Sequence, residues 1–249
     1  MKRPLALITG VGRSVGIAAG IARQLATDGW DLALNSWAAY DDRMPWAGSP
    51  SGLEELTQEL IASGADVLHL PGDLEDVVTA GALFRTISDH GAVPSALVLA
   101  HCESIDSSIM TTTVESFDRH YAVNVRANWQ LIREFALHVP ASGGSIVAFT
   151  SDALFGNVPY GATKAALDRL IVASARELAD RKIQANVINP GPIDTGWMSE
   201  ETRMQCLKRQ PSGRLGTPAD IANFVSFLLS GKGEWVNGQL LKVDGGFST

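Results

Sequence analysis

The fold and the predicted chemistry of this chain are decided by residues 144–178, which read GSIVAFTSDALFGNVPYGATKAALDRLIVASAREL. The apolar run Ile146–Phe149 predicts a buried strand that stops at Thr150-Ser151. A loop containing Gly, Asn and Pro follows. An Ala- and Leu-rich helix is expected from about Pro159, because proline fits the first helical turn.

Tyr160 and Lys164 are four residues apart, so both project from one face of this helix's first turn. A free tyrosine has a pKa of about 10. An ammonium group one turn away and the positive helix N-terminus favour the phenolate and lower that pKa. Ser151, at the end of the strand, is placed to donate a hydrogen bond to a substrate oxygen. The alternative is a surface helix with an incidental Tyr and Lys.

The composition is that of an ordinary globular protein. The chain has 249 residues, of which 45% are hydrophobic and 19% charged, enough for one sizeable domain. A net charge of −7 without a basic tract argues against nucleic acid and anionic membrane as partners. Cys102 and Cys206 suit a reducing compartment and lack the neighbours of a metal site. The first apolar run, ending at Gly10, is too short for a signal sequence or a membrane span. We therefore expect a cytoplasmic protein without a metal site.

The N-terminal region predicts a βαβ unit. A strand is expected over Leu5–Thr9, a Gly-rich turn over Gly10–Gly16, a helix over about Ile17–Asp28 and a second strand over Asp31–Asn35. Glycine lets backbone N–H groups approach a pyrophosphate at the helix N-terminus. A simple tight turn is the alternative, but the strand-to-helix context favours phosphate binding.

Residues 36–52 form an insertion with Trp37, Tyr40 and Trp46 and little periodicity. We expect a long loop at the edge of the sheet where ligands bind. Its aromatic side chains either cover the adenosine end of a cofactor or pack on one another.

The rest of the chain alternates between helical and strand patterns. Helices are expected over 53–62, 76–90, 116–139 and 218–229, and strands over 66–70, 96–100, 185–188 and 239–243. Without a repeat or linker, this alternation predicts a single α/β domain over 1–249: a doubly wound, Rossmann-type parallel sheet with helices on both faces.

Several separated motifs occur in the order found in one family. They are Thr9-Gly10…Gly16, Asp73, Asn124-Val125, Ser151, Tyr160…Lys164, Pro190-Gly191…Thr195, Arg214–Ala222, and Gly238…Val243-Asp244-Gly245-Gly246. On these residues the chain resembles the short-chain dehydrogenase/reductase family, and its ending resembles the 3-oxoacyl-carrier-protein reductase branch. The resemblance implies hydride transfer between a nicotinamide cofactor and a small carbonyl or alcohol substrate.

The resemblance also implies four catalytic residues. Tyr160 would be the general acid/base, and Lys164 would lower its pKa and hold the nicotinamide ribose. Ser151 would orient the carbonyl or hydroxyl. Asn124 would bend its helix and hold a water in a proton relay from Lys164, unless it is a polar residue on an exposed helix face.

A cofactor site is implied in the same way. Asp73 would contact the adenine, with the backbone of Leu74 beside it, although a loop acid or helix cap is the alternative. Residues bordering the nicotinamide carboxamide would include Thr195, which could instead cap the following segment. The full implied set is Gly10, Arg13, Ser14, Val15, Gly16, Ser36, Asp73, Leu74, Ala100, Tyr160, Lys164, Gly191, Ile193 and Thr195.

The expected cofactor is NADP(H). An acid at the end of the second strand would bind the ribose 2′-OH and repel a 2′-phosphate. Here the strand ends Leu34-Asn35-Ser36, with no acid until Asp41. Arg13, in the Gly-rich turn, is expected to pair with the phosphate unless it points to solvent, and Arg43 is a second possible contact.

Three departures from the family pattern matter. Ser14 replaces the middle glycine of the turn. The segment Leu99-Ala100-His101-Cys102 replaces Asn-Asn-Ala-Gly, so the usual side-chain hydrogen bonds are expected to be missing. We expect His101 and Cys102 to serve packing or solvent contact, the alternative being a redox or acid/base role. Ser151 precedes Tyr160 by only nine residues, so it either reaches the Tyr160 oxygen across a more open pocket or has a weakened role.

Residues 196–213 would form a substrate lid. Its cations Arg203, Lys208 and Arg209 either attract an acidic substrate or form a solvated helix face. Family members are commonly tetramers, and the Ala-rich face of 162–175 suits packing between subunits of a homotetramer or homodimer, or internal packing. The altered 99–102 segment and the shortened loop motivate a second hypothesis, a catalytically weak NADP(H)-binding regulatory protein.

Overall fold

The computed structural model describes residues 3–44, 52–153 and 156–249, and in this part of the chain it contains one seven-stranded parallel sheet. The strand order is β3-β2-β1-β4-β5-β6-β7. The strands are β1 (Leu5–Thr9), β2 (Asp31–Ser36), β3 (Val67–Pro71), β4 (Pro94–Leu99), β5 (Gly144–Phe149), β6 (Ile183–Asn189) and β7 (Leu240–Lys242). The expected doubly wound Rossmann-type fold is confirmed.

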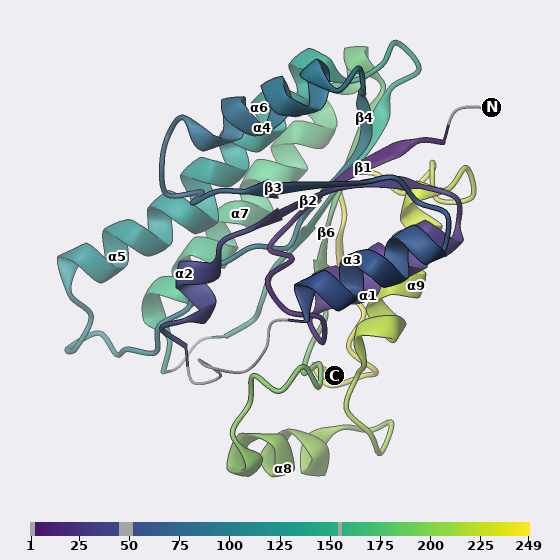
Figure 1. Cartoon of the computed structure of the whole chain (residues 1–249). Helices are drawn as coiled ribbons and strands as arrows, with labels where there is room; N and C mark the ends of the chain where they lie inside the picture. The colour runs from purple at the N-terminus through teal and green to yellow at the C-terminus, as the bar shows by residue number, and fades with distance from the viewer. Residues whose placement is uncertain (1–2, 45–51, 154–155) are drawn as a thin grey trace.

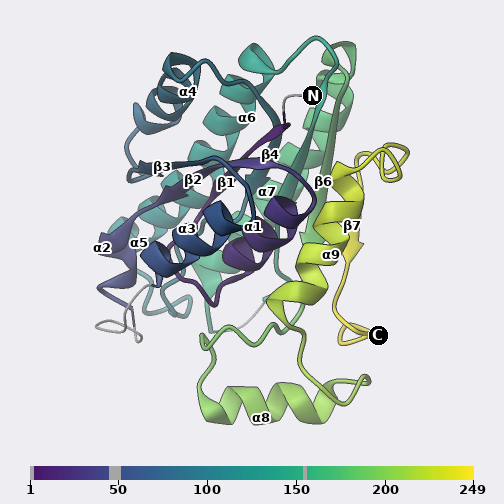
Figure 2. The same ribbon diagram turned by 45° about the vertical axis from the view of Figure 1, so that its right-hand side comes forward.

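Helices cover both faces of the sheet (Figures 1 and 2). On one face lie α1 (Ile17–Thr27), α3 (Leu53–Ala62) and α9 (Pro218–Leu229). On the other lie α4 (Thr79–Asp89), α5 (Val114–Tyr121), α6 (Ala127–His138) and α7 (Val158–Glu177). Each layer has its own apolar core, because the alternating side chains of each strand feed opposite faces.

The helices begin where their capping residues predict. Pro159 lies in the first turn of α7, as expected, because the missing N–H costs little there. The helix α9 begins with a capping box in which Thr217 and Asp220 satisfy each other's backbone N–H groups. Helix α1, like α7, has no side-chain cap at its N-terminus, where Gly16 is the N-cap residue. Its first N–H groups are therefore available to a ligand.

Three segments depart from the expected elements. The helix predicted over 116–139 is divided into α5 and α6 by a π-helical turn at Ala122–Arg126. The insertion after β2 is not wholly a loop, since it contains the short helix α2 (Ala38–Asp41); Pro45, Trp46 and Pro50 lie outside the described residues. The expected lid contains helix α8 (Glu200–Arg209), which lies apart from the sheet in Figure 2.

The order of the strands creates the cleft. β1 pairs with both β2 and β4, so the chain reverses direction of winding beside β1. Ligands of open α/β sheets bind at such a switch point, outside the carboxyl ends of the strands. Thr9, Leu99 and Phe149 end neighbouring strands there, which brings the loops after them together.

Candidate active site

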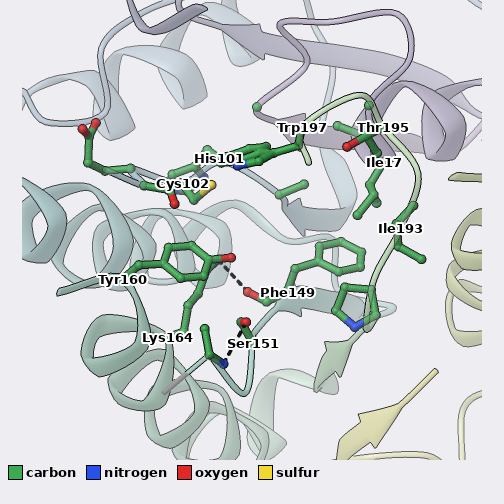
Figure 3. A pocket seen from close by; sticks show the side chains of 18 of the residues that line it. Ile17, His101, Cys102, Phe149, Ser151, Tyr160, Lys164, Ile193, Thr195 and Trp197 are labelled. Carbon is green, nitrogen blue, oxygen red and sulfur yellow. Dashed lines mark hydrogen bonds between the residues drawn. The ribbon is translucent and has the colours of Figure 1, made fainter. Parts of the chain in front are cut away.

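A cavity of about 570 Å³ opens at the carboxyl ends of the strands. It is bounded by the Gly-rich turn, the α2 region, the segments after β4, β5 and β6, and the beginning of α8. Figure 3 shows Tyr160, Lys164 and Ser151 near one another on one side, with His101 and Cys102 on another. The cavity thus joins the predicted cofactor cleft to the predicted catalytic residues.

Tyr160 and Lys164 project from the first turn of α7, as their spacing predicts. The Lys164 ammonium lies 5.5 Å from the centre of the Tyr160 ring. Its Nζ donates a 2.7 Å hydrogen bond to the carbonyl oxygen of Phe149, at the end of β5. Lys164 is 2% exposed, so the alternative of an incidental surface lysine does not hold.

Ser151 lies near Tyr160 across the shortened connection. Its hydroxyl is close enough to lower the pKa of the Tyr160 phenol, and its Oγ accepts a 3.2 Å hydrogen bond from the backbone N–H of Ala153. Residues 154 and 155 of this connection lie outside the described part of the chain. Ser151 is thus near Tyr160, and its part in orienting a substrate oxygen stays a prediction.

The electrostatics of the pair differ from expectation. Burial raises the pKa of Tyr160, the nearby Cys102 adds to this, and the hydrogen bond with Ser151 opposes it. Burial likewise lowers the pKa of Lys164, against the attraction of Cys102 and Asp168. The expected lowering of the Tyr160 pKa by Lys164 is therefore not seen, because removal from water outweighs it in this state. Tyr160 is therefore a neutral phenol at pH 7.

Asn124 lies in the π-helical turn and is completely buried, which rules out an exposed helix face. Its side chain accepts from the N–H of Glu103 at 2.7 Å and donates to the carbonyl of Glu103 and to Thr163 Oγ1. Its backbone carbonyl accepts a 2.8 Å hydrogen bond from Asn128 Nδ2. Asn124 thus fixes the segment after β4 to α7, while its part in a proton relay stays a prediction.

The Gly-rich turn is shaped for close approach of another group. Gly10 has φ of +77°, and a Cβ there would lie 2.7 Å from the backbone of His101. Gly10, Arg13 and Gly16 line the cavity together with Ala18 of α1. The uncapped N-terminus of α1 faces this space, and in its wall the Tyr40 hydroxyl is buried without a hydrogen-bond partner among the described residues. Both features fit a bound dinucleotide, whose phosphates and hydroxyls would supply partners.

Arg13 does not point to solvent. Its Nη2 donates a 2.8 Å hydrogen bond to the carbonyl of Thr195, across the cleft from the Gly-rich turn. The guanidinium therefore joins two predicted cofactor-binding segments. Ser14 and Val15 do not line the cavity with it; the Ser14 carbonyl accepts a hydrogen bond from Arg23, and Val15 is exposed.

Most of the other predicted cofactor residues line the cavity, and one of them does not. Ala100, Asp73, Leu74, Gly191, Ile193 and Thr195 line the cavity. Asp73 also receives the N–H of Glu75 and forms a 3.6 Å ion pair with Arg119, so it acts as a loop acid as well. Ser36 does not line the cavity and pairs instead with His69 Nε2 at 3.0 Å.

The expectation that side-chain hydrogen bonds are missing after β4 is wrong, because the His101 ring makes two such contacts. Its Nδ1 lies 2.7 Å from Thr9 Oγ1, and its Nε2 lies 3.1 Å from the carbonyl of Val123. Burial lowers the pKa of His101 to about 3, with Lys164 contributing, so the imidazole is neutral at pH 7. It is a structural bridge between β1, β4 and the π-helical turn, not an acid/base group. Cys102 lines the cavity, and burial raises the pKa of its thiol.

Sequence reasoning missed Glu103, which is 2% exposed and pairs with Arg43 and Arg119. Its signal was a charged residue four positions after the end of an apolar strand. In the lid, Arg203 pairs with Asp194 at 3.2 Å, and Arg209 lies 4.6 Å from the Phe247 ring. Both cations interact with other residues of the chain. This favours the alternative of a helix face over the alternative of cations that attract an acidic substrate. Among the described residues, no cluster of potential metal ligands occurs.

The doubly wound sheet, the Gly-rich turn and the placement of Tyr160 beside the buried Lys164 define a dinucleotide-binding α/β protein. The family model described as "Enoyl-(Acyl carrier protein) reductase" matches residues 10–248. The chain is 34% identical over 253 residues to "Uncharacterized oxidoreductase YjdA" of Bacillus subtilis (strain 168), covering 99% of this chain and 97% of that protein. The chain belongs to the short-chain dehydrogenase/reductase family of oxidoreductases, consistent with the expected reductase-like branch.

Two solved structures show the same fold. A short chain dehydrogenase from Burkholderia cenocepacia J2315, in complex with NADP, has a TM-score of 0.87 and 27% identity, with 99% of this chain and 98% of that chain covered. The angucycline C-6 ketoreductase LanV with bound NADP has a TM-score of 0.86 and 26% identity, with 98% and 95% covered. Within the described residues, no helix has the length and apolarity needed to cross a bilayer.

Proposed function

We propose that the protein is an NADP(H)-dependent oxidoreductase that interconverts a carbonyl and an alcohol, with Tyr160 as the general acid/base. The observation that carries this is the placement of the Tyr160 hydroxyl beside Ser151, with Lys164 behind it, in the cavity that continues to the Gly-rich turn. The bound dinucleotide supplies the hydride, and the protein supplies position and proton.

The chain's own residues account for the proton. Ser151 and Tyr160 are close enough to hold one substrate oxygen between their hydroxyls. Because burial keeps Tyr160 protonated at neutral pH, its hydroxyl donates to the oxygen that gains negative charge during reduction. Lys164, anchored on the Phe149 carbonyl, fixes the tyrosine's surroundings and is positioned to balance the phenolate left behind.

The cofactor preference is supported by Arg13 in the cleft and by the two NADP-bound relatives in structure. Reduction of a 3-oxoacyl group is one candidate reaction within this class, supported by the likeness to a carrier-protein reductase family model. Fold-level likeness is a weak guide to substrate, so a panel of ketones, aldehydes and alcohols with both nicotinamide cofactors is the informative screen.

Tyr160→Phe tests the mechanism. It removes the transferable proton while keeping the ring, so turnover should fall by at least about a thousandfold while the Kd for NADPH changes by less than about threefold. Both are measured through nicotinamide absorbance and fluorescence. Retention of turnover would refute the role of Tyr160. Tight NADPH binding by the wild type without turnover on any substrate would favour the regulatory alternative.

A further inference from the structure

Asn157 lies in the cavity wall just before helix α7, and its side chain does not cap that helix. An asparagine at the N-cap usually accepts a hydrogen bond from one of the first backbone N–H groups. Asn157 is the N-cap residue of α7, yet its side chain forms no such bond. Instead, its Nδ2 donates 2.8 Å hydrogen bonds to Ser104 Oγ and Asp106 Oδ1. The amide is therefore held by the segment after β4.

The side-chain carbonyl oxygen of Asn157 has no partner. Asn157 is 9% exposed, and its Oδ1 is buried without a hydrogen-bond partner among the described residues. The contact with Asp106 identifies this atom as the oxygen, because a carboxylate only accepts hydrogen bonds and must face the amide nitrogen. Buried polar atoms nearly always have a partner. An unpaired acceptor in the wall of a ligand cavity therefore indicates that a bound molecule supplies the donor.

The backbone fixes this acceptor close to the proposed catalytic tyrosine. Asn157 precedes Tyr160 by three residues, so the two lie at the first turn of α7, and both line the cavity. Asn157 also forms a β-bridge with Ser107, and the N–H of the residue after Asn157 donates a 3.0 Å hydrogen bond to the Ser107 carbonyl. A substrate held at Tyr160 therefore meets a second polar group whose position is set by the fold.

We define Ser104, Asp106 and Asn157 as the acceptor wall. All three line the cavity, and none of them belongs to the predicted cofactor set. The expected lid adds no charge to the cavity, since its described lining residues are Trp197, Met198, Thr202 and Cys206. An anionic group on the substrate would meet the Asp106 carboxylate in this wall. The acceptor wall therefore suits an uncharged group that donates a hydrogen bond.

We propose that the acceptor wall selects ketones that carry a hydroxyl group apart from the reacting carbonyl, and that Asn157 Oδ1 accepts the hydrogen bond of this hydroxyl. Asp106 is then a positioning residue, because it holds the amide nitrogen and so leaves the oxygen for the substrate. A ketone with an ether in place of the hydroxyl offers no donor and leaves the Asn157 oxygen unpaired. The inference rests on the proposed function, since it names the substrate class of that site.

The hydroxyacetophenones, meta and para, and their methyl ethers test the proposal. The members of each pair differ in the donor and little in the electronic character of the ring. The kcat/KM of each ketone is measured with NADPH at pH 7 through nicotinamide absorbance. In at least one pair, wild type should favour the hydroxy ketone by about tenfold, as expected for one neutral hydrogen bond to a buried acceptor.

Two variants assign this preference to the acceptor wall. In Asp106→Asn the amide of Asn157 can present either of its atoms to the substrate, so the ratio of hydroxy to methoxy ketone should fall to within about threefold of one. Asn157→Leu should lose the preference in the same way, because the acceptor is gone. Asp152→Asn is the control: it removes the same charge from another lining residue and should keep the wild-type ratio. Each ratio compares two substrates in one protein, so a general loss of activity cancels.

The proposal is overturned if wild type reduces the methyl ethers as efficiently as the hydroxy ketones. An unchanged ratio in Asp106→Asn or in a folded Asn157→Leu would also overturn it, as would an equal loss of preference in Asp152→Asn. These outcomes leave the proposed function intact, because ketones are still reduced. Failure to reduce any ketone of this panel or of the broader one, with either cofactor, would contradict the proposed function and the substrate class together.

Discussion

His101 departs from the family's sequence pattern after β4, yet its side chain still connects this segment to neighbouring elements. Its ring joins Thr9 at the end of β1 to the carbonyl of Val123 in the π-helical turn. If Nε2 donates to that carbonyl, Nδ1 accepts from the threonine hydroxyl, and a single neutral tautomer satisfies both contacts. Protonation would turn the Nδ1 acceptor into a donor and place a charge near Lys164. The imidazole must therefore stay neutral for the site to keep this geometry.

This burial predicts an acid sensitivity. The folded pKa of His101 is about 3, against about 6.5 in an unfolded chain, so between these values the unfolded state binds more protons. Stability therefore falls as the pH drops from about 6.5 toward 3. Between pH 7 and 5 this one residue should cost about 2 kcal/mol of unfolding free energy.

Urea denaturation of wild type and His101→Asn at pH 7 and pH 5 measures the effect. Asparagine does not titrate, so the variant should lose about 2 kcal/mol less than wild type over this interval, whatever its stability at pH 7. Equal losses in the two proteins would show that His101 does not carry the pH dependence.

Part of the site's geometry could be predicted at the level of residues, and the rest depends on contacts that no local pattern contains. Tyr160 and Lys164 lie one helical turn apart, so their common face follows from spacing alone. The contact of Asp41 with Gly12, by contrast, joins two segments through the path of the chain after β2. The bridge between Thr9 and His101 likewise spans 92 residues of sequence.

At the scale of elements, periodicity located the strands and most helices, but local backbone variants were missed. The π-helical turn at Ala122–Arg126 lies between α5 and α6 in a stretch without a helix-breaking residue, so the sequence predicted one continuous helix there. The helix α2 has only four residues and no buried side chain, so it has no apolar periodicity to detect. Both variants border the site, where such irregularity is common.

The helix caps offer a paired prediction. Thr217 caps α9, which packs against α1 and contributes to one apolar core, whereas Ser199 caps α8, which has no buried residues. Thr217→Ala should lower the unfolding free energy by about 1 kcal/mol, because the loss of the cap weakens a helix that the fold needs. Ser199→Ala should leave global unfolding nearly unchanged, since α8 can fray while the core stays folded.

Chemical denaturation with a common m-value measures both variants. A loss in Ser199→Ala equal to that in Thr217→Ala would mean that α8 unfolds together with the sheet. The same result would argue against a lid that moves independently of the domain.

At the scale of the whole molecule, several of the exposed apolar side chains lie on the helices α5, α6 and α7 of one layer. Phe117, Tyr121, Trp129, Leu137 and Val172 are all more than a third exposed. On α7, Ala162, Ala165 and Ala173 face outward, so the Ala-rich helix is only partly internal. Small outward residues allow close approach of a second helix, which supports the expected homodimer or homotetramer as a prediction.

Ala165→Glu should disrupt that association. A buried, unpaired carboxylate at a helix–helix contact is costly, so the variant should sediment as a smaller species than wild type at micromolar concentration. Val93→Glu is the control, because Val93 is exposed elsewhere, just before β4. Sedimentation velocity compares the three proteins. A monomeric wild type, or no difference between Ala165→Glu and wild type, would contradict the prediction.

The placement of β1 beside β4 also bears on how the molecule is made. Leu7 pairs with Leu97, so the central ladder cannot form until more than a third of the chain has left the ribosome. Parallel pairings of this kind close long loops and assemble late. The walls of the cleft come from segments spread between Gly10 and Phe247, and a nascent chain therefore cannot be stabilised by bound nucleotide until nearly all of it is synthesised. Until then, bound nucleotide cannot protect its apolar strands from aggregation.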